Sequence, residues 1–211
     1  MLSQTEDIVI RSLKFKESSL IVTLLTREFG VKAYLVRGVL KSKKSGFKAA
    51  HFQLLNQLEI LANHNAKGNL NSIKELKVIN PYESLIFDFS KQSLTLFIAE
   101  LLYNAIKEEQ DQVELYDFIK ESLNLLDATA DYVDFHLVFM MRLTRFLGFS
   151  PELQNKNNST FDLQEGKFVQ RANSPFCLSN QESILLQSLM QMGFADLDNK
   201  RFNNAERKAL L

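Results

Sequence analysis

Lysine and arginine gather in one short stretch of this sequence, where they could bind a polyanion. Between residues 27 and 48 a single acidic residue, Glu28, stands against seven basic ones: Arg27, Lys32, Arg37, Lys41, Lys43, Lys44 and Lys48. Tyr34 and Phe47 lie among them. Cations follow a phosphate backbone, and aromatic rings stack on bases of any sequence. The stretch therefore predicts a surface for nucleic acid, although a lysine-rich loop can also be merely a solvated one.

No other set of residues has the spacing of a reactive site. The three histidines, His51, His64 and His136, are far apart, and neither a Gly-x-Ser-x-Gly nor a His-Glu-x-x-His motif occurs. Cys177 is the only cysteine, which excludes an intrachain disulfide and a zinc site of paired cysteines. We interpret His136 as a core histidine. The sequence thus predicts a protein that is not an enzyme and holds no cofactor or metal.

Charge is unevenly distributed along the 211 residues, although 25 basic and 25 acidic side chains cancel overall. Residues 1–50 carry a balance of +6, whereas residues 81–136 carry −9. Such asymmetry indicates a basic module joined to an acidic one. We expect a domain at 1–80 and a second at 81–211.

Short β-rich runs that must position the basic stretch occupy the first module. We expect strands at residues 8–15, 20–26, 31–38, 52–61 and 73–79, with four of the seven glycines of the chain among their turns. In the run 52–61, Phe52, Leu54, Leu58 and Ile60 share one face. Five short strands predict a small barrel or sandwich, and we expect a barrel of the oligonucleotide-binding (OB) type, in which strands 2–3 and the loops contact the ligand. The basic stretch would supply strand 3 and the long connection after it.

The period changes to that of helices at Pro81, so the whole chain is expected to have an α+β fold. Helices are expected at 91–107, 113–126 and 132–147, the last buried and ended by Gly148 and Pro151. A β-hairpin is expected at 161–169 within a polar insertion at 152–178. Ser179 and Glu182 have the spacing of a capping box that opens another helix. The last helix starts near Asn203 or Asn204 and still runs at Leu211, so we expect a chain shortened at its C-terminus.

Two blocks of sequence resemble a known family. Segments 17–26 (ESSLIVTLLT) and 36–45 (VRGVLKSKKS), with Gly30 between them, resemble the N-terminal domain of the RecO family of bacterial recombination mediators. Segment 142–153 (RLTRFLGFSPEL) resembles a helix end of the same family. The resemblance covers essentially the whole chain.

The resemblance implies a function in DNA repair and recombination. RecO-like proteins bind single- and double-stranded DNA, anneal complementary strands, and dock on the acidic, apolar-ended tail of the single-stranded-DNA-binding protein. With RecR they help RecA replace that protein. By resemblance Lys41, Lys43, Lys44 and Lys48 would lie in the DNA-contacting loop. Many members also carry four zinc-binding cysteines, but this chain has QNKNN at 154–158, so the 152–178 hairpin insertion would stand in place of a zinc module.

A receptor for such a tail needs an apolar groove with a basic rim. Positions on one face of the predicted helix 132–147 offer one, namely Phe139, Arg142, Leu143 and Phe146, with Arg145 nearby. The alternative is that the apolar residues are core and the arginines pair with acids of other helices. The next candidate is the cluster Lys200, Arg201, Arg207 and Lys208.

Two other readings of the whole chain remain open. A protein-only scaffold would use the acidic helices to bind a basic partner, and a hydrolase would need a nucleophile and base that the sequence does not reveal. No stretch is apolar enough to span a membrane and the N-terminus lacks the features of a signal peptide, so we expect a cytoplasmic, nucleoid-associated bacterial protein.

Overall fold

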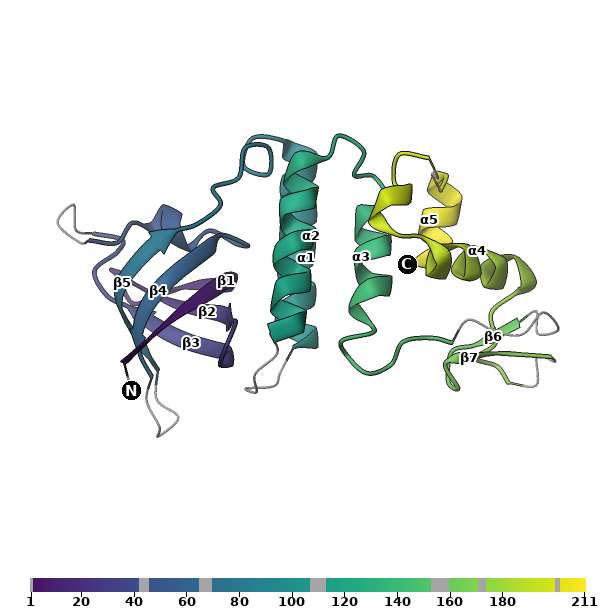
Figure 1. Cartoon of the computed structure of the whole chain (residues 1–211), viewed down its shortest axis with the longest axis horizontal. Coiled ribbons are helices and arrows are strands. Elements are labelled where there is room, and N and C mark those ends of the chain that lie inside the picture. The colour runs from purple at the N-terminus through teal and green to yellow at the C-terminus, as the bar shows by residue number, and fades with distance from the viewer. Residues whose placement is uncertain are drawn as a thin grey trace. The chain divides into compact units, whose positions relative to one another are not determined.

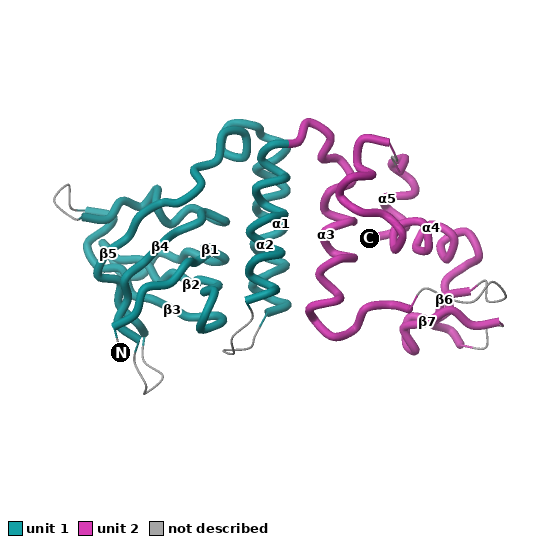
Figure 2. The backbone as a smooth tube through the Cα atoms, in the orientation of Figure 1, with its two compact units in different colours: residues 1–128 teal, residues 129–211 magenta. Residues whose placement is uncertain are grey.

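The chain folds into two compact units, residues 1–128 and 129–211 (Figure 2). The computed structural model describes residues 2–41, 46–64, 70–106, 113–152, 160–170, 174–199 and 202–211. Helices α1 and α2 belong to the first unit together with the strands, whereas the sequence places them in a second domain. A domain boundary near residue 80 stays a prediction.

A five-stranded antiparallel sheet forms the N-terminal part of the first unit (Figure 1). Its strands are β1 (Leu2–Phe15), β2 (Ser19–Thr26), β3 (Gly30–Val36), β4 (Gln57–Asn63) and β5 (Ser72–Val78), in the order β3-β2-β1-β4-β5. The two edge strands meet at a bridge between Tyr34 and Asn71, where the Leu35 N–H donates to the Asn71 carbonyl at 2.9 Å. Because a single bridge joins the two edges among the described residues, the barrel is partly open, as in the OB-fold. The predicted fold class is confirmed.

Alternate residues of the strands fill the barrel. Val9, Val22, Leu24, Tyr34 and Leu58 belong to one buried cluster, which also includes residues of β5 and of the connection before β4. The residues of β1 and β2 that alternate with these point outward. A register shift between Val9 and Arg11 lets β1 stay long while it bends around the barrel.

The connection between β3 and β4 differs from the prediction. Residues 52–56 are not strand: a short 3-10 helix η1 (Ala49–Phe52) precedes a turn in which Leu55 has a φ of 64°, and β4 begins only at Gln57. Phe52 is buried in the barrel core and the Leu55 N–H donates to the Val9 carbonyl at 2.7 Å. The alternation from Phe52 was therefore a chance match to a strand pattern.

Helices α1 (Phe89–Ala105) and α2 (Val113–Ala128) complete the first unit. Asp88 caps α1 by accepting from the Ser90 and Lys91 N–H groups. In the linker between β5 and α1, residues 79–88, the Glu83, Ser84 and Leu85 N–H groups donate to the Asp127 carboxylate of α2 at 2.8–2.9 Å. These bonds lower the pKa of Asp127 against the effect of its burial.

The second unit contains α3 (Phe135–Leu143), β6 (Thr160–Asp162), β7 (Lys167–Val169), α4 (Asn180–Gln191), η2 (Phe194–Asp196) and α5 (Asn204–Leu210). The hairpin predicted at 161–169 is confirmed, and Gly166 has the positive φ that its turn requires. The Ser179 hydroxyl accepts from the Glu182 N–H, as the capping box predicts.

The predicted helix 132–147 was too long. Helix α3 starts at Phe135 and ends at Leu143, and tighter bonds follow, in which the Arg145 and Phe146 N–H groups donate to carbonyls three residues earlier. The last helix, α5, covers Asn204–Leu210, and the Leu211 N–H still donates to the Arg207 carbonyl at 3.2 Å, as expected of a helix that reaches Leu211. Among the residues that the structure describes, no helix is long and apolar enough to cross a membrane.

Candidate nucleic-acid interface

The cations predicted to bind nucleic acid lie at two different ends of the barrel. Arg27 and Lys32 flank the turn from β2 to β3, whereas Arg37 and Lys41 follow the far end of β3. Strand β3 is seven residues long, and each residue rises about 3.3 Å. The predicted set therefore does not form one patch.

Arg27 serves the contact between the sheet and helix α2. Its Nε and Nη2 donate to the two carboxylate oxygens of Asp117, both at 2.9 Å. This bidentate bond lowers the pKa of Asp117. The Arg27 guanidinium is thus bound by a carboxylate of its own unit and is not available to contact phosphate.

Tyr34 was predicted to stack on bases, and that prediction is wrong. Its side chain is 0% exposed in the barrel core, where its hydroxyl is 2.8 Å from His64 Nε2. His64 also contacts Ser3 Oγ at 3.1 Å and the edge of Phe29. Burial first, and the charge of Lys32 second, lower the pKa of His64. Lys32 and Tyr34 therefore belong to a polar cluster at the β2–β3 end of the barrel.

Two turns far apart in sequence meet at the opposite end of the barrel. The Leu40 N–H donates to the Ser18 carbonyl at 3.0 Å, and Lys41 forms an ion pair with Glu17. Lys14 is level with Val36 across β2, because both residues pair with Leu20. This contact places the β1–β2 turn beside the connection that follows β3. We call Lys14, Lys16, Arg37 and Lys41 the basic barrel end.

All four side chains of the basic barrel end are exposed. Lys14 and Arg37 form no ion pair with the described residues. Sequence reasoning missed Lys14 and Lys16, because it treated residues 16–19 only as a polar turn. The available signal was two lysines on either side of Phe15, directly before a loop that an OB-fold uses for binding.

The rest of the predicted loop is only partly described. Lys43 and Lys44 lie outside the described residues. Lys48 is exposed where the described chain resumes, just before η1. Phe47 is half-buried and packs against the barrel core, with its ring centroid 6.3 Å from that of Phe52. Only part of the Phe47 side chain is thus available for stacking.

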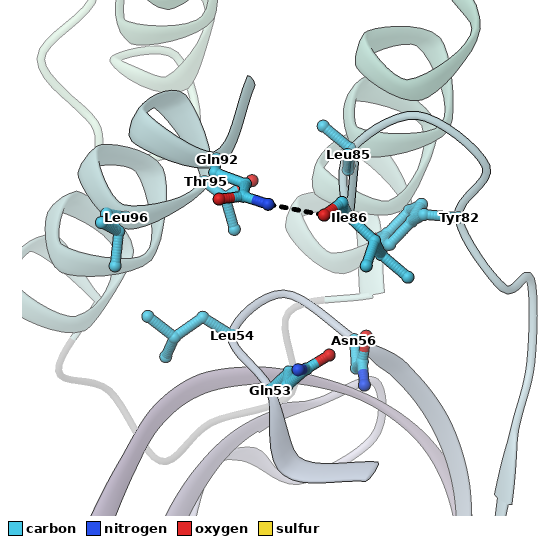
Figure 3. Close-up of a pocket in the computed structure, with 9 residues that line it drawn as sticks. All are labelled: Gln53, Leu54, Asn56, Tyr82, Leu85, Ile86, Gln92, Thr95 and Leu96. Carbon is cyan, nitrogen blue, oxygen red and sulfur yellow. Dashed lines mark hydrogen bonds between the residues drawn. The ribbon is translucent and has the colours of Figure 1, made fainter. Parts of the chain in front are cut away.

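A pocket of about 330 Å³ opens between η1, the linker and α1 (Figure 3). Its wall combines aliphatic side chains with the amides of Gln53, Asn56 and Gln92, and includes the ring of Tyr82. None of the described residues that line the pocket carries a charged side chain, so the pocket adds no cation to the predicted interface.

The residues predicted to bind a partner's tail are largely core or engaged. Phe139 is 0% and Leu143 is 1% exposed, so the predicted apolar strip does not exist on the surface. Arg142 Nη2 donates to the Met192 carbonyl at 2.5 Å. Arg145 and Phe146 are exposed, next to the end of α3. A nearby pocket of about 690 Å³ is lined by Glu152, Glu165 and Lys167 as well as apolar side chains, which does not favour an acidic ligand.

The lone cysteine and the acidic side chains give no further candidate site. Cys177 Sγ lies 3.5 Å from Asp162 Oδ2 within the hairpin region. Among the described residues, no three His, Cys, Asp or Glu side chains are grouped so as to hold a metal ion.

Comparison with known proteins gives consistent matches over the whole chain. The family model for the N-terminal part of recombination protein O matches residues 1–82, and the model for its C-terminal part matches residues 86–211. The DNA repair protein RecO of Christiangramia forsetii is 39% identical over 211 residues, covering 100% of this chain and 88% of the relative. Those of Flavobacterium psychrophilum and Bacteroides fragilis are 36% and 35% identical, each over at least 99% of this chain and 87% of the relative. The chain therefore belongs to the RecO family of DNA repair proteins.

Proposed function

We propose that this protein is a DNA-binding recombination mediator. It binds single- and double-stranded DNA and anneals complementary strands. Together with RecR it helps RecA to assemble on DNA coated by the single-stranded-DNA-binding protein. The observation that carries the proposal is the basic barrel end, where cations from two turns meet on a partly open OB-type barrel.

Binding is electrostatic in this account. A side chain that neutralises one phosphate releases counterions, so affinity falls with salt in proportion to the number of contacts. Exposed lysines and arginines on turns can contact the phosphate backbone of DNA of any sequence. The four residues of the basic barrel end and Lys48 together provide enough cations to contact a short run of phosphates.

A salt titration of oligonucleotide binding tests the proposal, with single- and double-stranded DNA side by side. If about four phosphates are neutralised on a single strand, the slope of log affinity against log salt is about −3. Affinity then falls roughly 50-fold between 50 and 200 mM salt. An affinity that does not depend on salt, or no retention on DNA at moderate salt, would favour a scaffold that binds only proteins.

The acidic tail of the single-stranded-DNA-binding protein docks on the second unit in this proposal. Arg145 and Phe146 support it, because a guanidinium and an aromatic ring are exposed together at the end of α3. That end of the helix is stabilised by the buried side chains of Phe139 and Leu143 and by the hydrogen bond of Arg142 to the Met192 carbonyl.

A further inference from the structure

Two phenylalanine rings are open to solvent where the linker meets helix α1. Phe87 is 83% and Phe89 is 81% exposed, the highest exposed fractions among the large apolar side chains that the structure describes. Ile86 before them and Leu96, two turns along α1 from Phe89, are exposed as well. Exposed apolar surface gathered in one place is typical of a contact with another molecule. We call Phe87 and Phe89 the aromatic knob.

Hydrogen bonds hold the turn that carries the aromatic knob. The Phe87 N–H donates to the Ser84 carbonyl at 3.0 Å. The buried Lys91 ammonium donates to the Ser84 hydroxyl at 2.7 Å and to the Asp127 carbonyl at 2.9 Å. Because these bonds already fix the turn in the free protein, ordering it costs little when the rings are buried by a partner.

The pocket of about 330 Å³ lies directly beside the aromatic knob (Figure 3). Ile86, the residue before Phe87, lines it together with Leu54 of the connection before β4 and Leu96 of α1. Gln92 Nε2 donates to the Ile86 carbonyl, which fastens this wall of the pocket to α1. The volume is at the lower end of the range for ligand pockets, so the pocket can accept a large apolar side chain.

Knob and pocket on the same surface make that surface complementary to itself. When two copies meet about a two-fold axis that passes between knob and pocket, the knob of each copy faces the pocket of the other. A charged residue near such an axis would meet its own copy and repel it. Neither the knob nor the described residues that line the pocket carry a charge, so this repulsion does not arise. A strongly acidic or basic partner would find no opposite charge in this pocket.

We propose that the aromatic knob and the pocket beside it are the contact surface for a second copy of this chain, with the knob of each copy in the pocket of the other. The inference goes beyond the proposed function, because no DNA takes part in the contact. The two rings, each about four-fifths exposed, offer roughly 250–400 Å² per copy. A stable interface buries about 800 Å² per partner. The pocket wall adds to the area of the rings, so the dimer is reversible rather than permanent.

Sedimentation equilibrium of the full chain without DNA tests the proposal. The average mass should rise from one chain toward two as the protein concentration is raised. Phe87→Ser should increase the dissociation constant of the dimer about tenfold or more, because one ring per copy no longer leaves water. Phe176→Ser is the matched control, since Phe176 is also an exposed ring but lies in the second unit.

The outcomes of this comparison are separate. Dimerisation that is weakened in Phe87→Ser and unchanged in Phe176→Ser supports the proposal. Equal losses in both variants, or none in Phe87→Ser, overturn it. A wild type that stays monomeric at every concentration also overturns it and would assign the surface to a different protein. Each of these results leaves the salt titration of DNA binding unaffected, so the proposed function is judged independently.

A mixture of two variants tests the reciprocal arrangement of knob and pocket. Leu96→Arg places a cation at the pocket, and Leu96 is 60% exposed, so the core is not disturbed. Leu96→Arg keeps its knob, whereas Phe87→Ser keeps its pocket. Each variant alone loses both contacts of the symmetric dimer, but a mixed pair keeps one. The equimolar mixture should therefore contain more dimer than either variant alone, after thermal melting has shown that both are folded. A mixture that associates no better than the separate variants overturns the proposal.

Discussion

Single residues show what a strand pattern can and cannot predict. Alternation places Lys32, Tyr34 and Val36 on one face of β3, and the structure keeps them on one face. That face points into the barrel, so Tyr34 is core and Lys32 is half-buried. Since β2 (SLIVTLLT) is apolar on both faces, the sequence could not indicate which face was inside. Which face of the strand lies inside is determined only when the sheet curves into the barrel.

The environment of Asp7 makes the stability of the fold depend on pH. It is fully buried, and neither of its carboxylate oxygens has a hydrogen-bond partner among the described residues. Burial, and then the charges of Glu28 and Glu6, raise its pKa well above the usual value. The folded state therefore keeps the proton over a pH range in which the unfolded chain has released it.

Replacing Asp7 with asparagine should remove this pH dependence. An unfolded aspartate titrates near pH 4, so wild-type stability should fall as the pH rises from there toward the raised pKa of Asp7. Each pKa unit corresponds to about 1.4 kcal/mol. In urea unfolding, the free energy of unfolding of Asp7→Asn minus that of the wild type should be greater at pH 8 than at pH 5.

The exposed Glu75 provides the control for this experiment. Glu75→Gln should keep the wild-type pH dependence. If the stability of Asp7→Asn changes between pH 5 and pH 8 as much as that of the wild type, Asp7 does not carry the effect.

Among helices and strands, local sequence signals predicted the boundaries that depend on neighbouring residues. The mispredicted boundaries are those that tertiary packing determines. Ser179 and Glu182 identified the start of α4, because a capping box needs only residues three apart. Phe52 was assigned to a strand because its spacing fits one, yet its ring fills the barrel from a 3-10 turn. The C-terminal end of α3 was also set by packing, since Leu143 and Phe139 are core and the chain turns directly after them.

Replacing Arg145 tests the docking of the acidic tail at the end of α3. Losing one charge-assisted contact is worth roughly 1.5–3 kcal/mol, so Arg145→Glu should weaken a tail peptide about tenfold or more. Binding to bare DNA should be nearly unchanged. Fluorescence anisotropy of a labelled peptide measures the effect.

Lys208→Glu is the charge-matched control, because Lys208 is exposed on α5. Arg142→Glu is unsuitable, since the Arg142 guanidinium holds the Met192 carbonyl. Unchanged peptide affinity in folded Arg145→Glu, with a loss in Lys208→Glu, would place the tail on α5 instead.

For the molecule as a whole, the zero net charge hides a local separation. The acidic stretch 81–136 includes α1 and α2, and two of its residues form ion pairs with the sheet: Asp117 with Arg27, and Lys120 with Glu6 at 2.6 Å. Helix α2 thus pairs one acid with a barrel cation, Arg27, and one lysine with a barrel acid, Glu6. The basic barrel end is left with Glu17 as its one acidic neighbour in the described turns, paired with Lys41. Charge balance alone could not predict this, because it depends on which acids the fold brings to which bases.

Reversing two charges of the basic barrel end tests the central claim most directly. Arg37→Glu/Lys41→Glu changes the net charge by the same amount as Lys74→Glu/Lys77→Glu, two exposed lysines of β5 that serve as the control. The first variant should lose about tenfold or more in affinity for single-stranded DNA at 50 mM salt, with a salt slope smaller by about 1.4. The control should remain close to the wild type. Equal losses in both folded variants, or none in the first, would contradict the placement of DNA at this end of the barrel.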